Sequence, residues 1–215
     1  MGLRHQTKPL GTNFFLPANF LSKHLAAFID NASSSLTRPC HIQLKGKKTK
    51  DNSEVVFKEA LQEMNWIQQA KIVFNVPKPL HFCNYQHCCE CAEHDETLLN
   101  SDVDSIGLEQ LGNPGWDPLC FCSPEGLLYY MPAIVRITLD TMEKPQEMYL
   151  DQMLFHLIHD GMDNRIVTAC SEEQREFVAS FLQHLVENYS SEIEAGFYCS
   201  DDILRAHEIW NVPKT

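Results

Sequence analysis

The middle of the chain reads SPEGLLYYMPAIVRITL, residues 123–139. Ser123 is a favoured helix N-cap residue, and Pro124 suits the first helical position. Residues 127–139 are apolar on most sides of a helix, which is typical of a helix inside a core. Pro132 lies beyond the first turn. We expect a kink there, because proline removes a backbone hydrogen bond and its ring clashes with the preceding turn. The stretch therefore predicts a central buried helix.

Helical patterns also occur on both sides of this stretch. Ser171 and Gln174 form a capping box that opens a predicted helix over residues 171–189. Further helices are predicted over residues 53–72, over residues 149–158 and after Ser200. No useful run alternates between apolar and polar residues. The predicted fold class is mainly α, a compact multi-helix single domain with an irregular Cys/His-rich loop and a central buried helix.

Length and composition limit the class of protein. The chain has 215 residues, of which 44% are hydrophobic and 21% charged. These values are typical of globular proteins and exclude a disordered or fibrous chain. The longest apolar run, residues 127–139, is interrupted by Pro132 and Arg136, so no membrane span is predicted. No apolar segment follows the basic residues near the N-terminus, and we expect a cytoplasmic location.

Charge divides the chain into two parts. Residues 1–50 carry eight Lys and Arg and one Asp, whereas residues 51–215 carry nine Lys and Arg and 28 Asp and Glu. The predicted organisation is a basic N-terminal extension at 1–52, with a short helix and a linker, and a helical domain at 53–215. The acidic body argues against broad nucleic-acid binding.

Four of the nine cysteines and three of the ten histidines lie in the stretch HFCNYQHCCECAEHD, residues 81–95. Cys88 and Cys91 have the C-x-x-C spacing that directs two thiolates at one ion. Cys91 and His94 would share one face of a helix. His87 is a fourth candidate, although we expect difficulty in using it together with its neighbour Cys88. The pattern predicts a structural Zn²⁺ site.

Other ligand sets and other roles stay open at this point. Cys83 is a local alternative as the fourth ligand, and Cys120 and Cys122 form a C-x-C pair further along the chain. The cysteines of the stretch could instead be reduced packing residues or a redox-active pair. His156 and His159 also have ligand spacing, although surface histidines on helices are commoner.

Several blocks of the sequence resemble a family of small helical bacterial proteins classified as a domain of unknown function. The blocks are HCCECAEHD (87–95), GNPGWDP (112–118), SPEG (123–126), YYMPA (129–133) and SEEQ (171–174). The resemblance spans roughly Ser53 to Trp210. It implies a bacterial, cytoplasmic, helical protein and brings no established activity. Cys88, Cys91 and His94 match the recurring positions of the family, and Cys83 departs from them.

Three functions are compatible with these features. The chain lacks a Gly-rich phosphate loop, a G-x-S-x-G sequence and an H-E-x-x-H sequence. We therefore expect a non-catalytic helical interaction or regulatory module, immunity-like by analogy, with structural zinc and a protein partner. One alternative is a zinc-dependent, hydrolase-like metalloenzyme that uses the Cys/His cluster. The other is an acidic mimic of nucleic acid.

Overall fold

The structure of the chain is a computed structural model that describes residues 63, 65–195 and 199–211. These residues all belong to one compact unit. The predicted short helix and linker of the N-terminal extension lie outside the described residues, as does the predicted domain boundary at residues 52 and 53.

Helix α5 (Pro124–Thr141) forms the centre of the described fold, as its sequence predicts. The Ser123 hydroxyl accepts a hydrogen bond from the Gly126 N–H at 3.1 Å and caps the helix. Thirteen of its 18 residues are buried, so most of its circumference contacts other elements. Because full burial of one large aliphatic side chain stabilises a fold by about 1.5–3 kcal/mol, this helix contributes a large share of the core.

Shorter elements surround α5. In chain order they are a helix over residues 65–73, α3 (Cys89–Leu99), α4 (Leu108–Leu111), η2 (Pro114–Trp116), η3 (Pro118–Phe121), α5, α6 (Leu150–Ile158), η4 (Gly161–Asp163), α7 (Arg165–Ala169), α8 (Glu172–Asn188), α9 (Ser190–Ala195) and α10 (Cys199–Trp210). The described residues contain no β-strand, only an isolated antiparallel bridge between Cys83 and Cys122. The mainly α fold is confirmed. In this part of the chain, no helix has both the length and the apolar composition that crossing a bilayer requires.

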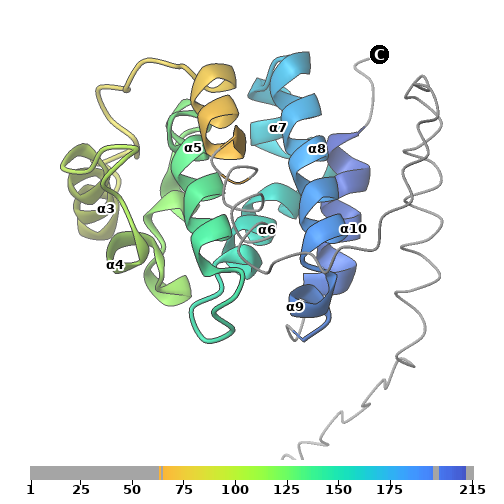
Figure 1. Cartoon of the computed structure of the whole chain (residues 1–215). Helices are drawn as coiled ribbons and strands as arrows, with labels where there is room; N and C mark the ends of the chain where they lie inside the picture. Colours follow the sequence, from red (N-terminus) through yellow and green to blue (C-terminus); the bar gives the residue numbers. More distant parts are fainter. Residues whose placement is uncertain (1–62, 64, 196–198, 212–215) are drawn as a thin grey trace, which may run out of the picture. The chain divides into compact units, whose positions relative to one another are not determined.

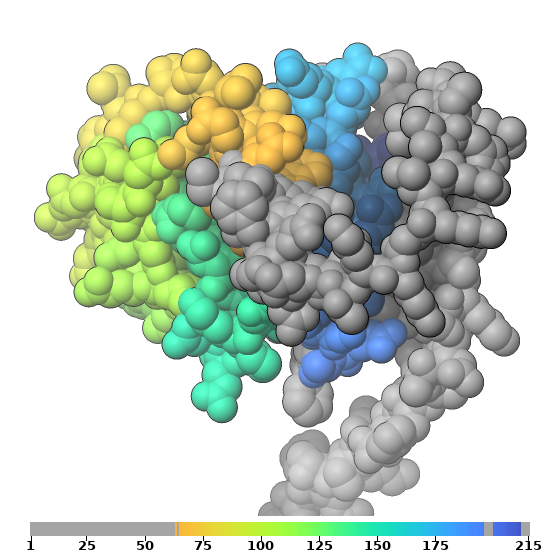
Figure 2. Space-filling view, viewed as in Figure 1, coloured from red at the N-terminus to blue at the C-terminus, as the bar shows by residue number. Residues whose placement is uncertain are grey.

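Helices α3 and α4 lie on one side of α5, and α8 and α10 lie on the other (Figure 1). Helix α10 packs against α6 and α8, whereas α3 packs against η3, the turn that leads into α5. In Figure 2 the helix over residues 65–73 (orange) lies between the α3–α4 surface (yellow-green) and α8 (blue). The Cys/His-rich stretch is therefore attached to the core through η3 and α5.

Sequence patterns account for most helix ends and buried faces. The capping box of α8 is confirmed, since Ser171 Oγ accepts from Gln174 N–H at 3.2 Å and Gln174 Oε1 accepts from Ser171 N–H at 3.0 Å. Ile72, the last residue of the helix predicted over residues 53–72, is exposed. Ala70 and Phe74, four residues apart, form the inward face, and Ile72 lies opposite them in solvent.

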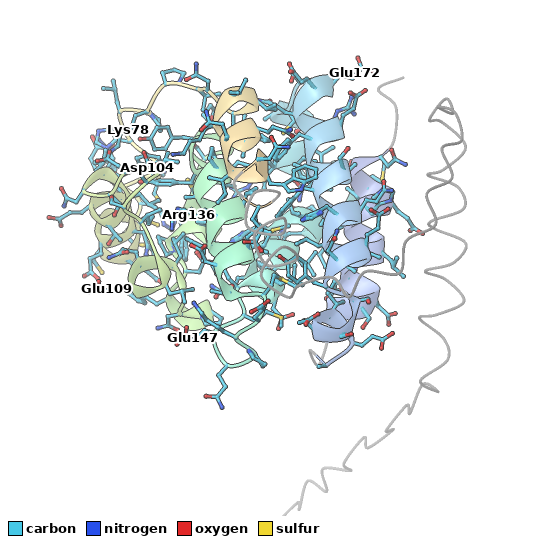
Figure 3. All side chains as sticks on the ribbon, in the orientation of Figure 1. Lys78, Asp104, Glu109, Arg136, Glu147 and Glu172 are labelled. Atoms are coloured by element: carbon cyan, nitrogen blue, oxygen red, sulfur yellow. The ribbon has the colours of Figure 1, made fainter. Side chains whose placement is uncertain are left out.

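Two cations hold the chain that follows α3. Lys78 Nζ donates hydrogen bonds to the backbone oxygens of Leu99 at 2.9 Å and Ser101 at 2.8 Å. Arg136 of α5 donates from Nη2 to the Ile106 oxygen at 2.5 Å. Figure 3 labels both cations on the α3 side of the molecule. Because the last carbonyls of a helix have no intrahelical donor, these contacts fasten the end of α3 beside α5.

Candidate metal centre

Three of the predicted ligands, His87, Cys88 and Cys91, come together at the start of α3. Each offers one ligand atom, and these atoms lie within 4.8 Å of one another. Cys91 Sγ is 3.4 Å from Cys88 Sγ and 3.5 Å from His87 Nδ1. The chain turns at residues 85–87 before α3 begins, so the neighbours His87 and Cys88 reach the same point. The expected difficulty in using these two residues together does not arise.

These separations suit tetrahedral coordination of one ion. Zn–S bonds of about 2.3 Å and Zn–N bonds of about 2.0–2.1 Å place two sulfurs about 3.8 Å apart, and a sulfur and a nitrogen about 3.5 Å apart. The S–S separation in the structure is 3.4 Å and the S–N separation is 3.5 Å. Small side-chain rotations are therefore enough for a Zn²⁺ ion to fit between the three atoms.

The position of Cys88 at the N-terminus of α3 favours a thiolate. Cys88 is the N-cap residue, and its Sγ accepts a hydrogen bond from the Cys91 N–H at 3.4 Å. This N–H, followed by hydrogen bonds from the side chains of Cys91 and His87, lowers the pKa of the Cys88 thiol. The pKa of Cys91 is raised, mainly because its side chain is hydrogen-bonded to Cys88. The first thiolate forms on Cys88, and the thiolate is the form that binds metals.

Asp95 of α3 ties the preceding segment to this helix. Its Oδ1 accepts hydrogen bonds from Phe82 N–H at 2.6 Å and Cys83 N–H at 2.9 Å. Its Oδ2 lies 2.7 Å from His81 Nδ1. Burial alone would raise the pKa of Asp95, but the hydrogen bonds outweigh it and lower that pKa. Asp95 therefore positions the segment that leads to the three ligands.

His94, which the spacing placed among the ligands, does not join this group. Its side chain is 1% exposed, and its ring lies 4.7 Å from the Trp116 ring and 4.9 Å from the Phe121 ring. Neither ring nitrogen has a hydrogen-bond partner among the described residues. Glu90 Oε1 lies 3.7 Å from Nε2. Helix α3 turns this side chain toward the aromatic rings. His94 therefore packs against Trp116 and Phe121 and does not join the predicted zinc ligands.

The alternative fourth ligands also lie outside the group. Cys83 and Cys122 are buried and face each other across the isolated bridge. Burial, and after it the charge of Asp95, raises the pKa of Cys83 to about 12. Cys120 belongs to a different cluster, described below. Within the described part of the chain, the group offers three protein ligands and no fourth within 4.8 Å.

A second group of potential ligands, not predicted from the sequence, joins η3 to α6. Asp117, Cys120 and His156 each offer an atom within 4.8 Å of the other two. Asp117 caps η3, with its Oδ1 accepting from Leu119 N–H at 2.9 Å. Its Oδ2 lies 2.8 Å from His156 Nε2. No sequence signal brought His156 to Asp117.

Asp117 is the buried anchor of this turn. Its residue is 4% exposed, whereas Trp116 is 44% exposed. The Trp116 ring covers the buried His94 from the solvent side. The Asp117 carboxylate is buried, where a backbone N–H and His156 compensate its lost hydration.

A cavity of about 280 Å³ adjoins the second group. Cys120, His156, His159, Asp160 and Arg165 are among the residues that line it. Partial burial, followed by the charge of Asp117, raises the pKa of the Cys120 thiol to about 11. His159 Nδ1 lies 2.9 Å from Asp160 Oδ2. Asp160 has a φ of 64°, a left-handed conformation that is uncommon outside glycine and clusters at functional sites.

Comparisons with known proteins add no assignment. No protein-family model, curated protein or solved structure matches the chain. The family resemblance noted from the sequence blocks therefore stays a prediction.

Proposed function

We propose that this protein is a zinc-binding helical interaction module. The observation that carries the proposal is the convergence of His87, Cys88 and Cys91, with Cys91 Sγ 3.4 Å from one partner atom and 3.5 Å from the other. Two thiolates and an imidazole are the ligands that Zn²⁺ prefers, and they disfavour Mg²⁺ and Ca²⁺, which bind oxygen.

The ion would have a mechanical role at the start of α3. His87 precedes the helix, Cys88 caps it, and Cys91 lies within its first turn. A Zn²⁺ ion bound to all three would prevent the first turn from fraying and would fix the entering chain. Binding to the folded chain alone stabilises it by about 4 kcal/mol at a free-metal concentration 1,000 times the Kd.

The surface around α3 has the character of a contact site for a protein partner. Trp116 and Phe121 are exposed and pack on His94 of α3, and Tyr85 is exposed and stacks on His81. Exposed apolar groups gathered in one region are typical of interaction surfaces. Zinc would hold the segment that carries Tyr85 and the start of α3, the helix whose His94 packs against Trp116 and Phe121.

Metal analysis of the purified full-length chain tests the proposal. We expect one zinc ion in this group, lost in Cys88→Ser and Cys91→Ser together with the metal-dependent gain in stability. Cys89→Ser is the matched control, because Cys89 is exposed, adjacent to Cys88 and outside the group. Equal zinc content in Cys91→Ser and wild type would contradict the proposal.

The metalloenzyme alternative differs from this proposal in the fourth coordination position. Three protein ligands leave a position for water, as in catalytic zinc sites. Ester hydrolysis that depends on zinc and is lost in Cys91→Ser would favour that alternative. The nucleic-acid mimic stays a prediction, and competition of the chain with DNA for a basic DNA-binding protein would test it.

A further inference from the structure

The hydrogen bond between Asp117 and His156 explains how η3 is held to α6, but it does not explain Cys120. That residue lies one turn after Asp117, with its N–H donating to the Asp117 backbone oxygen at 3.1 Å. Its sulfur faces the same point as the carboxylate and the imidazole. The ligand atoms of the three residues all lie within 4.8 Å of one another.

The atom types in this group point to a cation. A carboxylate oxygen, a thiolate sulfur and an imidazole nitrogen all bind Zn²⁺ at about 2.0–2.3 Å. Asp117 can use Oδ2 for an ion while Oδ1 keeps the hydrogen bond that caps η3. Zn²⁺ would separate Oδ2 from His156 Nε2 to about 3.3 Å, compared with 2.8 Å in the structure. This change is within the reach of side-chain rotation.

The adjoining cavity supplies what distinguishes this group from the first. Cys120 and His156 line the cavity, so an ion bound to them would face its interior. Tyr149 is buried, and its hydroxyl has no hydrogen-bond partner among the described residues. Burial, and after it the charges of Asp117 and Cys120, raises the pKa of this hydroxyl well above its usual value. Three protein ligands and an open side are the arrangement of sites that bind an exchangeable ligand.

The cavity wall indicates the class of that ligand. Arg165 lines the cavity and donates from Nη2 to the Cys120 backbone oxygen at 3.2 Å. His159 and Asp160, also in the wall, pair with each other at 2.9 Å. A metal ion and a guanidinium on the same cavity favour a small oxyanion.

We propose that Asp117, Cys120 and His156 bind a second zinc ion, with one coordination position open to the cavity for a small carboxylate or other oxyanion. This inference is independent of the zinc site at His87, Cys88 and Cys91. The two groups share no ligand, so either can exist without the other.

Cobalt titration of the metal-free, full-length chain tests the proposal, because Co²⁺ reports thiolate ligands by its absorption. We expect a Co²⁺ ion at the second group that is lost in Cys120→Ser and retained in Cys91→Ser and in the control Cys89→Ser. Asp117→Asn keeps an oxygen acceptor for the cap of η3 and serves as the second variant if Cys120→Ser folds poorly by circular dichroism. It should weaken Co²⁺ binding at least tenfold.

Acetate is the probe for the open position. Its addition should change the visible spectrum of the Co²⁺ ion that depends on Cys120, and Arg165→Gln should weaken that response by about tenfold. Cobalt binding that is the same in wild type and Cys120→Ser would overturn the proposal. A spectrum insensitive to acetate would overturn the open position. Loss of the first site alone, in Cys91→Ser, bears only on the function proposed above.

Discussion

The two ligand groups differ in the kind of structure that assembles them. His87, Cys88 and Cys91 lie at one exposed helix end, and adjacent residues supply all three ligands. Asp117 and His156 are 39 residues apart and meet only because α6 packs near η3. The first group therefore depends on one local turn, whereas the second depends on the tertiary fold.

Because of this difference, the two groups should contribute differently to the stability of the metal-free chain. In the first group His87 and Cys88 are exposed and Cys91 is buried, and the group contributes little to the fold until a metal joins its three ligands. In the second, Asp117 and His156 are 4% and 6% exposed, so their hydrogen bonds are needed in the metal-free chain. Substitutions at the two groups test this contrast, and the largest effect is expected at Asp117.

Asp117→Ala should destabilise the metal-free chain by about 2–4 kcal/mol, because the buried His156 and the N–H of Leu119 lose their acceptor. His87→Ala, at the exposed group, should change the free energy of unfolding by less than about 0.5 kcal/mol. Urea denaturation monitored by circular dichroism measures both. Similar losses in the two variants would remove the contrast.

Gly126→Ala should destabilise the chain by about 1–3 kcal/mol. A Cβ at this position would come within 2.4 Å of Cys122 Sγ and 2.9 Å of the Phe82 ring, where the segment before the first group packs against the core. Gly115→Ala is the control, since its nearest contact would be 3.4 Å from Asn113 Oδ1. Thermal unfolding compares the two variants. An equal decrease in Tm for Gly126→Ala and Gly115→Ala would show that the neighbours of residue 126 move aside without cost.

The thiols of the two groups should react at different rates in the metal-free chain. At pH 7.5 the thiolate fraction of Cys88, whose pKa is lowered below 9.0, exceeds that of Cys120, whose pKa is raised to about 11, by at least about 100-fold. The higher nucleophilicity of the more basic thiolate reduces this to about tenfold in rate. Alkylation by iodoacetamide, followed by mass spectrometry, measures it. Faster labelling of Cys120 would contradict the assignment.

The smallest effect concerns pH and the support of the first group by Asp95. Its pKa is lowered below 3.8 in the folded chain, so its stabilising contribution is complete above pH 3.8 and is lost as the pH falls through the folded-state value. Asp95→Asn should remove this contribution, of about 1 kcal/mol. Between pH 5 and pH 3, wild type should then lose more stability in urea than the variant. Equal losses of stability in wild type and Asp95→Asn would show that other groups cause the acid sensitivity.

Local patterns predicted the helices that have strong end signals or continuous apolar faces. Ser123 and Pro124 defined the start of α5, and Ser171 with Gln174 defined the start of α8. The exposure of Ile72 was not predictable, because the spacing of apolar residues around it allowed more than one inward face. Packing against the rest of the core decided between them.

The same distinction applies to the ligands. Cys88 and Cys91 could be predicted because their spacing is part of a helix N-terminus. His94 has equally good spacing, but only the position of Trp116 and Phe121 shows that its ring points inward. The second group, Asp117, Cys120 and His156, could not be predicted from the sequence. A helical pattern does not indicate which helix packs beside which turn.

The isolated bridge between Cys83 and Cys122 holds two buried thiols opposite each other. Residues paired in this way have Cα atoms about 4.5–5.5 Å apart, a distance that disulfide bonds also span. Burial raises the pKa of both thiols, so the pair should resist oxidation and persist in a reducing compartment. A disulfide there would close a loop of about 40 residues and stabilise the chain by about 4 kcal/mol. That loop contains His87, Cys88 and Cys91 of the first group and Asp117 and Cys120 of the second, so one covalent bond would fasten both groups to the core.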